Sequence, residues 1–297
     1  MSILFRHVTD SFYAHHKREL HPSQDDFPLH VHDAHEFCYF ISGSGTFYIE
    51  SNAYEAYPGC ILIIRAGETH RLKVNPNLPY ERIDIEFSPA LLNGLDPEGQ
   101  LTEAFTRRPA GQRNLYTPDM LTSDLVRCCM NTLSAQFQVI PDRQKPLALT
   151  SCLAPVLLDV RRAFVSQDSE EAPQTGKAVT LVSQVIEYIN AHLCEKFGLD
   201  TLTREFYTSK THLNHQFKLV TGFTVCEYIV VKRLILARQY IRDGMSIGTA
   251  AAACGWSDYS SFYRSYKARF GVSPSADKHA DVLKLHPDFD IRRGLIK

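Results

Sequence analysis

Short runs that either alternate between apolar and polar residues or are wholly apolar fill the stretch between residues 36 and 87. β-Branched and aromatic residues are common in these runs, and turn-forming residues separate them. Period-two alternation is typical of strands, and several short strands at this tight spacing favour a small sandwich or barrel. The predicted strands are 36–42, 46–50, 53–57, 61–64, 70–74 and 80–87.

A helical period replaces the strand pattern beyond about residue 88. Segments 121–138 and 147–165 contain no glycine and have helical spacing, so two helices are expected to follow the strands. The polar, acidic stretch 166–177 contains proline and glycine and has the composition of a linker. All later predicted elements are helices, at 179–196, 202–206, 209–219, 225–242, 247–254 and 258–270.

Two parts of the helical half resemble each other. Segments 202–222 and 249–271 each contain a short helix, a tight turn, a longer helix and a closing glycine, which indicates a duplicated helix-turn-helix unit. The helix between them, with roughly 18 residues, would be roughly 27 Å long. It would hold two recognition helices about one DNA turn (~34 Å) apart. Its predicted inward side chains are Tyr228, Ile229, Ala237, Tyr240 and Ile241.

The longer helix of the second unit has one apolar and one polar face. Phe262, Tyr266 and Phe270 are spaced four apart and are expected to pack inward. Arginine is suited to bidentate contact with guanine, serine and tyrosine to base edges or phosphates, and lysine to phosphates. The predicted DNA-facing side chains are Tyr259, Ser260, Ser261, Tyr263, Arg264 and Lys267.

The first unit repeats this arrangement. Ser209 is the expected helix cap, and Leu213 and Phe217 form the inward pair. Asparagine pairs well with adenine, and flanking lysines suit backbone phosphates. The predicted DNA-facing side chains are Lys210, Thr211, Asn214, His215 and Lys218.

The charge distribution supports a polyanionic partner for the helical half. From Lys177 onward the chain has 17 basic and 11 acidic residues, whereas the first 176 residues have 15 and 22. The net charge of −1 therefore hides a basic back half and an acidic front half, although chance partitioning would give the same asymmetry. No apolar run approaches the ~20 residues of a membrane span, and the N-terminus has no signal-peptide pattern. Eight cysteines without CxxC spacing favour a reducing cytoplasm.

The front half carries candidate metal ligands. His30, His32 and Glu36 have the order HxHxxxE, and His70 follows in RAGETH. Alternation along a strand points His30 and His32 to one face, and three imidazoles with a carboxylate suit a first-row divalent metal. The alternative is that the four residues line a pocket and hydrogen-bond each other or a ligand. His35 would point to the opposite face and is expected to be exposed.

The helical half resembles the AraC/XylS family of bacterial transcription regulators. The matching motifs are SKTHLNHQFKLVTGFTVCEYIVVKRLILA (209–237) and CGWSDYSSFYRSYKARFGVSPS (254–275), within about 179–278. Two departures are Thr203, where the family often has a small residue, and Tyr207, where it often has glycine. The resemblance implies that the operator contacts are Thr211, Asn214, His215, Ser260, Ser261, Tyr263 and Arg264.

Residues 28–75 are similar to the two cupin motifs, with three departures: the missing glycine before His30, Arg65 and Val74. The barrel interior is therefore the expected effector site, and the family resemblance implies a sugar or related metabolite. Sensor barrels of this family often keep the histidines without a reported metal. Phe40, Phe47 and Tyr48 could stack on a ring but are better explained as core.

Three further expectations concern the periphery of the barrel. Residues 7–27 could form an arm over its mouth. The helices at 121–138 and 147–165 could form a dimer face, with Leu147, Leu153, Leu157 and Leu158 as candidates. RNA polymerase is a candidate partner, and the tail at 279–297 has no interpretable pattern.

Together these patterns predict an α+β protein. A cupin-like β-barrel with accessory helices would occupy 1–165, and an all-α domain with two helix-turn-helix units would occupy 178–278. The expected function is a ligand-responsive, sequence-specific DNA-binding transcription regulator with no catalytic residue, which binds its operator as a homodimer. Two alternatives stay open: a cupin enzyme that uses a metal at the His/Glu cluster, and an adaptor whose helices bind a protein.

Overall fold

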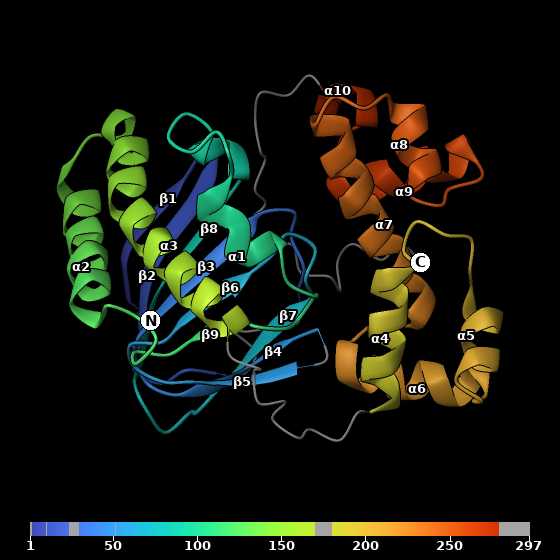
Figure 1. Cartoon of the computed structure of the whole chain (residues 1–297), viewed down its shortest axis with the longest axis horizontal. Coiled ribbons are helices and arrows are strands. Elements are labelled where there is room, and N and C mark those ends of the chain that lie inside the picture. The colour runs from blue at the N-terminus through green and yellow to red at the C-terminus, as the bar shows by residue number, and fades with distance from the viewer. Residues whose placement is uncertain (1, 10, 24–29, 51, 170–179, 279–297) are drawn as a thin grey trace.

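The structure is a computed structural model that describes residues 2–9, 11–23, 30–50, 52–169 and 180–278. The predicted tail at 279–297 lies outside the described residues, as does most of the predicted linker. Two antiparallel sheets and a flanking pair of helices form the first half, and a bundle of helices forms the second (Figure 1). The α+β prediction is confirmed. Within the described part of the chain, no helix combines the length and apolar character that a bilayer crossing requires.

The larger sheet has six strands in the order β1-β2-β8-β3-β6-β9, and the smaller has the order β5-β4-β7. All six predicted strands are present, shifted by at most one residue at their ends. The strands are β1 (Ser2–Val8), β2 (Phe12–Glu19), β3 (His35–Ser42), β4 (Gly45–Ile49), β5 (Asn52–Ala56), β6 (Ile61–Ile64), β7 (His70–Val74), β8 (Tyr80–Phe87) and β9 (Leu115–Tyr116).

The prediction of an N-terminal arm over residues 7–27 is wrong where the structure describes this segment. Strand β2 pairs with β8 along its whole length, from Phe12 opposite Phe87 to Glu19 opposite Tyr80. Strand β1 pairs in turn with β2. These residues are therefore part of the sheet, and residues 10 and 24–29 of the predicted arm lie outside the described residues.

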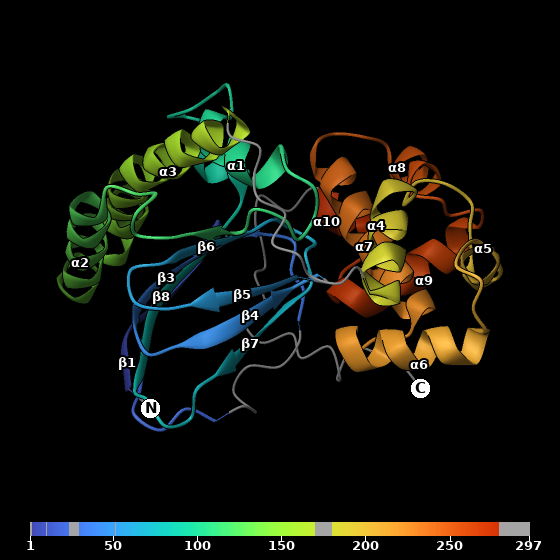
Figure 2. The same cartoon turned by 60° about the horizontal axis from the view of Figure 1, so that its bottom comes forward.

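The two faces of the six-stranded sheet differ in chemistry. Phe37, Ile83 and Ile85 point to the outer face, where they share an apolar core with Leu149 and Leu153. That core is covered by three helices, α1 (Glu103–Thr106), α2 (Ser123–Val139) and α3 (Lys145–Ser169). The inner face is the one turned toward the three-stranded sheet (Figure 2).

The two helices predicted after the strands are α2 and α3. Helix α3 continues to Ser169, so residues 166–169 are helical rather than linker. Two of the four leucines proposed for a dimer face, Leu153 and Leu157, are fully buried against the sheet, which corrects that part of the prediction. Leu147 and Leu158 are exposed.

The second half contains only helices among its described residues. Leu213 and Phe217 are buried in the core of the first unit, and Phe262 and Tyr266 in that of the second, as predicted. The helices are α4 (Leu181–Ala191), α5 (Leu199–Glu205), α6 (Lys210–Thr221), α7 (Val225–Arg242), α8 (Ile247–Ala253), α9 (Tyr259–Phe270) and α10 (Pro274–Lys278).

Helix α7 is the predicted spacer and has 18 residues. Thr224 and Glu227 form a capping box at its start, in which each side chain accepts a hydrogen bond from the other residue's backbone N–H. Tyr228, Ala237 and Ile241 are buried, and the helix contributes to the cores of both units. A single well-capped helix therefore fixes the two units relative to one another.

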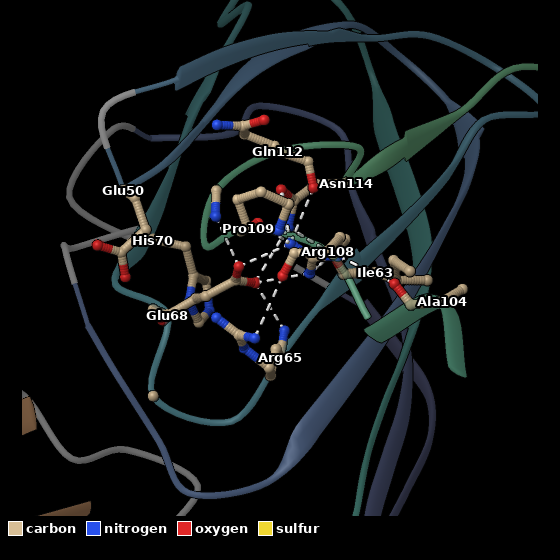
Figure 3. A network of polar contacts seen from close by, with 12 residues as sticks. Glu50, Ile63, Arg65, Glu68, His70, Ala104, Arg108, Pro109, Gln112 and Asn114 are labelled. Atoms are coloured by element: carbon tan, nitrogen blue, oxygen red, sulfur yellow. Dashed lines mark hydrogen bonds and ion pairs between the residues drawn. The ribbon is translucent and has the colours of Figure 1, made fainter. Parts of the chain in front are cut away.

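A buried ion pair holds the loop between β6 and β7 in place (Figure 3). The two terminal guanidinium nitrogens of Arg108, Nη1 and Nη2, donate to the two carboxylate oxygens of Glu68 at 2.7 and 2.8 Å, and both side chains are fully buried. The backbone N–H groups of Gly111 and Arg65 also donate to Glu68. Burial alone would raise the pKa of Glu68, but the guanidinium and these donors outweigh it and lower the pKa to about 2. The pair therefore anchors the loop that leads into His70.

Replacing Arg108 by methionine should leave the Glu68 carboxylate buried without its cation. We expect the free energy of unfolding of the sheet-containing half to fall by about 3–5 kcal/mol, the usual effect of breaking one side of a buried pair. Urea unfolding followed by far-UV circular dichroism measures this change. The fluorescence of Trp256, the single tryptophan, reports the helical half separately.

Arg107→Met is the matched control. Arg107 is an exposed neighbour that pairs with Glu103, so its loss should change the stability little. Equal stability of the two variants would contradict the anchoring role of the buried pair.

Candidate DNA-binding surface and effector site

Helix α9 presents a polar face opposite its buried side. Asp258 caps its start and accepts hydrogen bonds from the backbone N–H groups of Ser260 and Ser261. Of the predicted DNA-facing side chains, four are exposed and two are half-buried. The exposed ones are Tyr259, Ser260, Arg264 and Lys267, and the half-buried ones are Ser261 and Tyr263.

Helix α6 is built in the same way. Ser209 accepts from the backbone N–H of His212, as predicted for the cap. Lys210, Thr211, His215 and Lys218 are exposed. Lys210 forms an ion pair with the exposed Asp200 at 2.5 Å. A surface pair of this kind is weak, so Lys210 can exchange it for a phosphate at little cost.

Asn214 differs from the other predicted contacts on α6. It is half-buried, and its side-chain oxygen accepts a hydrogen bond from the backbone N–H of Val225 at 3.1 Å. That N–H is at the start of α7, where helical amides lack a partner within the helix. The asparagine oxygen is therefore used to hold α6 to α7, and a contact between Asn214 and DNA stays a prediction.

The two turns are alike although their residues differ. Gly255 has a φ of 77°, in the left-handed region that favours glycine. Tyr207, at the corresponding place in the first unit, has a φ of 49° and is 97% exposed. The tyrosine thus adopts the conformation that glycine would supply, and the first unit keeps its helix-turn-helix form despite this departure from the family pattern.

The four predicted metal ligands lie together at the inner face. One ligand atom from each of His30, His32, Glu36 and His70 lies within 4.8 Å of those of the other three. Glu36 Oε2 lies 3.0 Å from His32 Nε2 and 2.9 Å from His70 Nε2. His30 and His70 also exchange backbone hydrogen bonds, both of 2.9 Å. We call these four residues the His/Glu cluster.

The outer ring nitrogens of two histidines are held by backbone carbonyls. His32 Nδ1 lies 3.0 Å from the carbonyl oxygen of Ala34, and His70 Nδ1 lies 3.0 Å from that of Glu68. A carbonyl accepts only, so each Nδ1 carries a proton, and each Nε2 faces the cluster, where it can hold a second proton or bind a metal. Metal-ligating histidines usually have this arrangement. Among the described residues, the buried Nε2 of His70 has no hydrogen-bond partner in good geometry, so the residues present fit a metal.

Burial and neighbouring charges shift the pKa values of His32, Glu36 and Glu86 at the cluster. Burial opposes a charge on His32, but Glu86 and Glu36 outweigh it and raise the pKa of His32 to about 9. Burial likewise favours neutral Glu36, but His70 and His32 lower its pKa. Burial raises the pKa of Glu86 to about 7, since the nearby His32 only partly offsets it. The cluster therefore concentrates negative charge that a cation, either a proton or a metal, compensates.

A row of polar side chains continues from the cluster along the inner face. Strand β2 places His15 opposite Asp84 and Lys17 opposite Arg82. His15 Nε2 lies 2.8 Å from Asp84, and Arg82 Nε lies 2.5 Å from it. The buried Nδ1 of His15 has no hydrogen-bond partner among the described residues. The inner polar row comprises Tyr13, His15, Lys17, Glu19, Arg82, Asp84 and Glu86.

The sequence patterns did not predict the inner polar row. The signal is present as alternation in FYAHHKRE and YERIDIEF, where every second residue is polar or aromatic. The first stretch is predicted as an arm, so its alternation does not enter the strand prediction. Because the two strands are neighbours, their polar residues lie side by side.

The prediction that His35 is exposed is wrong. Its ring does point away from Glu36, but that face of the sheet is covered, and His35 is only 4% exposed. The ring stacks on Phe105 and Nδ1 accepts from the backbone N–H of Ala66. Burial, together with Arg108, lowers the pKa of His35 to about 3, so it is neutral. Phe40 and Phe47 are buried in the core between the sheets, as expected.

Comparison with known proteins identifies both halves. The profile of AraC-like ligand binding domains matches residues 13–146, and that of a helix-turn-helix domain matches residues 202–279. The two matches together span more than two thirds of the chain. The chain belongs to the AraC family. It is a DNA-binding transcription regulator with a ligand-binding domain.

Members of the AraC family are similar to the chain over most of its length. The HTH-type transcriptional activator RhaR of Pectobacterium atrosepticum is 28% identical over 265 residues, which is 87% of this chain and 88% of that protein. RhaS of Mannheimia succiniciproducens is 24% identical over 266 residues, covering 84% of this chain and 89% of the relative. Among solved structures, ToxT of Vibrio cholerae has a TM-score of 0.35 at 13% identity, and the match covers 90% of this chain and 97% of that one.

Proposed function

We propose that α6 and α9 insert into successive grooves of operator DNA and read its sequence. The observation that carries this proposal is that each helix buries one face in its own unit and leaves a basic, polar face exposed. Arg264 would read a base, and Lys218 and Lys267 would contact phosphates. The full proposed set is Lys210, Thr211, Asn214, His215, Lys218, Tyr259, Ser260, Ser261, Tyr263, Arg264 and Lys267.

Arg264→Ala tests this base-reading role. On genomic fragments selected by the parent protein, we expect binding to weaken by about 1–3 kcal/mol, because a bidentate contact with guanine is lost. Electrophoretic mobility shift or fluorescence anisotropy measures the affinity. Arg127→Ala, which removes an exposed arginine from α2, is the control and should bind as the parent does.

Salt dependence separates this proposal from an adaptor function. Affinity for DNA should fall steeply with ionic strength through counterion release, whereas a protein partner would give a shallow dependence. If the Arg264→Ala variant binds DNA as tightly as the parent protein does, the proposed contact between Arg264 and a base is contradicted.

We infer that the effector binds at the inner face, between the His/Glu cluster and the inner polar row. Buried charged and hydrogen-bonding groups at this density favour a small polar ligand, and a carbohydrate offers hydroxyl groups that suit them. A divalent metal is a second proposed occupant, held by His30, His32, Glu36 and His70. Three nitrogen ligands and one carboxylate suit Co²⁺, Ni²⁺, Fe²⁺ or Zn²⁺.

Co²⁺ tests the metal proposal because its visible absorption reports its ligands. The full chain should bind Co²⁺, and Glu36→Gln should weaken binding by at least about 100-fold, more than the usual effect of losing a group outside the ligand shell. Isothermal titration calorimetry supplies the affinity. His192→Gln alters a histidine on the helical half that pairs with Glu195, and it should leave binding unchanged. Unchanged Co²⁺ affinity in Glu36→Gln would exclude the His/Glu cluster as the site.

The proposed function includes no chemical step. The relatives of the chain are transcriptional activators. In this proposal a metal at the His/Glu cluster would only bind and orient the effector. The cupin-enzyme alternative instead requires turnover by the first half after the helical half is removed. We propose that the protein acts in the cytoplasm, where its DNA is, with RNA polymerase as a further partner.

We propose a homodimer formed through α3. Leu147, Leu158 and Val165 are exposed, and their spacing of 11 and 7 residues places them on one stripe of this helix. Two copies packed along the stripe would bury it. Leu153 and Leu157 do not belong to this face because they are buried against the sheet.

Leu158→Glu should convert the dimer to a monomer, since it places a charge in the proposed apolar contact. Sedimentation velocity measures the mass. Leu78→Glu alters a leucine of similar exposure in the loop between β7 and β8 and should leave the dimer intact. A parent chain that stays monomeric, or a variant that stays dimeric, would contradict the role of α3.

A further inference from the structure

The two halves of the protein meet along a charged, largely buried seam on α7. Lys232 Nζ donates to Glu50 Oε1 at 2.9 Å and to the carbonyl oxygen of Gly67 at 2.7 Å. Tyr228 donates to the other oxygen of Glu50. The side chain of Glu50 is fully buried and that of Lys232 is 8% exposed. Thr69 also donates its backbone N–H to Glu50, so the seam reaches the loop that precedes His70.

A second part of the seam lies at residues 31–33. Asp33 Oδ2 lies 2.9 Å from both Arg238 and Arg242 of α7. Arg269, near the end of α9, donates to the carbonyl oxygen of Val31 at 3.0 Å. The Val31 side chain is 2% exposed and packs in the core of the first helix-turn-helix unit. The sensor half therefore contributes a residue to the core of the DNA-binding half.

Along residues 30–33, successive side chains belong in turn to the His/Glu cluster and to the seam. His30 and His32 turn toward Glu36 and His70, while Val31 and Asp33 hold α7 and α9. Gly67 links the same two sites, because its N–H donates to the carbonyl oxygen of His32 and its own carbonyl accepts from Lys232. In this segment each cluster residue is therefore adjacent in sequence to a seam residue.

We propose that occupancy of the His/Glu cluster and docking of the DNA-binding half are coupled through residues 30–33. A cation bound across the cluster joins His30 and His32 to Glu36 of β3 and His70 of β7. It thereby fixes the backbone that presents Val31 and Asp33, and it favours the docked state. Loss of the cation frees this backbone and favours separation of the halves. The inference rests on the proposed effector site and names how that site would regulate the protein.

Coupling of this kind is reciprocal. If the cation favours docking, docking must raise the affinity for the cation by the same factor. Seam residues that lie far from the cluster therefore affect cation binding, although they never touch the cation. Since α7 carries both helix-turn-helix units, docking also sets the orientation in which α6 and α9 meet DNA.

The test is the Co²⁺ affinity of the full chain with and without the seam. The double variant Lys232→Met, Arg269→Met removes contacts to Glu50, Gly67 and Val31 and leaves all four cluster residues in place. We expect roughly 5- to 150-fold weaker Co²⁺ binding, the usual range of coupling between sites. Removing two positive charges would by itself strengthen binding of a cation, so weaker binding reports lost docking and not a changed field.

Arg204→Met is the matched control. It removes an exposed cation of α5, outside the seam, and should leave Co²⁺ affinity unchanged. Far-UV circular dichroism with urea unfolding checks that the sheet-containing half of each variant is folded, and Trp256 fluorescence checks the helical half. As a second measurement, Co²⁺ should slow hydrogen exchange of the α7 amides in the parent chain and not in the double variant.

The outcomes separate the two proposals. A parent chain that binds no Co²⁺ refutes the metal site and the coupling together. Equal Co²⁺ affinity in the parent and the folded double variant refutes the coupling alone, as does α7 exchange that is unaffected by Co²⁺ in the parent.

Discussion

A carboxylate that is taken out of water must find a cation or several hydrogen-bond donors, and this constraint organises the protein. Glu68 meets it within the first half through Arg108. Glu50 meets it across the two halves through Lys232 and Tyr228. Glu36 meets it among histidines. Each solution fixes a different part of the structure: a loop, the joint between halves, and the proposed ligand site.

Much of the architecture could be predicted from the sequence because local patterns determine it. The strands between 36 and 87 are short alternating or apolar runs separated by turn residues, and both helix-turn-helix units have caps, turns and apolar pairs at fixed spacing. The His/Glu cluster could also be predicted, since His30 and His32 share a face and the motif places His70 opposite them. In each case the information lies within a few residues of the feature.

Features that depend on distant partners could not be predicted in this way. The alternating polar residues of β2 form part of a polar row only because β2 pairs with β8, some 70 residues later in the chain. His35 is on the expected face, but a helix that the sequence does not place there buries it. Asn214 has a side chain suited to contact with a base, but its side-chain oxygen accepts a hydrogen bond from the backbone N–H of Val225. The seam joins residues that are 165 to 238 positions apart, and no local pattern marks Glu50 or Lys232 as partners.

Both halves supply residues to the seam, and this limits how the two halves could be exchanged between related proteins during evolution. The first half carries Glu50 and Asp33, whereas α7 of the second half carries their counterions. A chimera that grafts this sensor onto a foreign reader helix would leave both acids at the contact between the halves without their counterions. Recombination between such genes is therefore constrained to keep the sensor and α7 together, or to exchange acids and bases as a set.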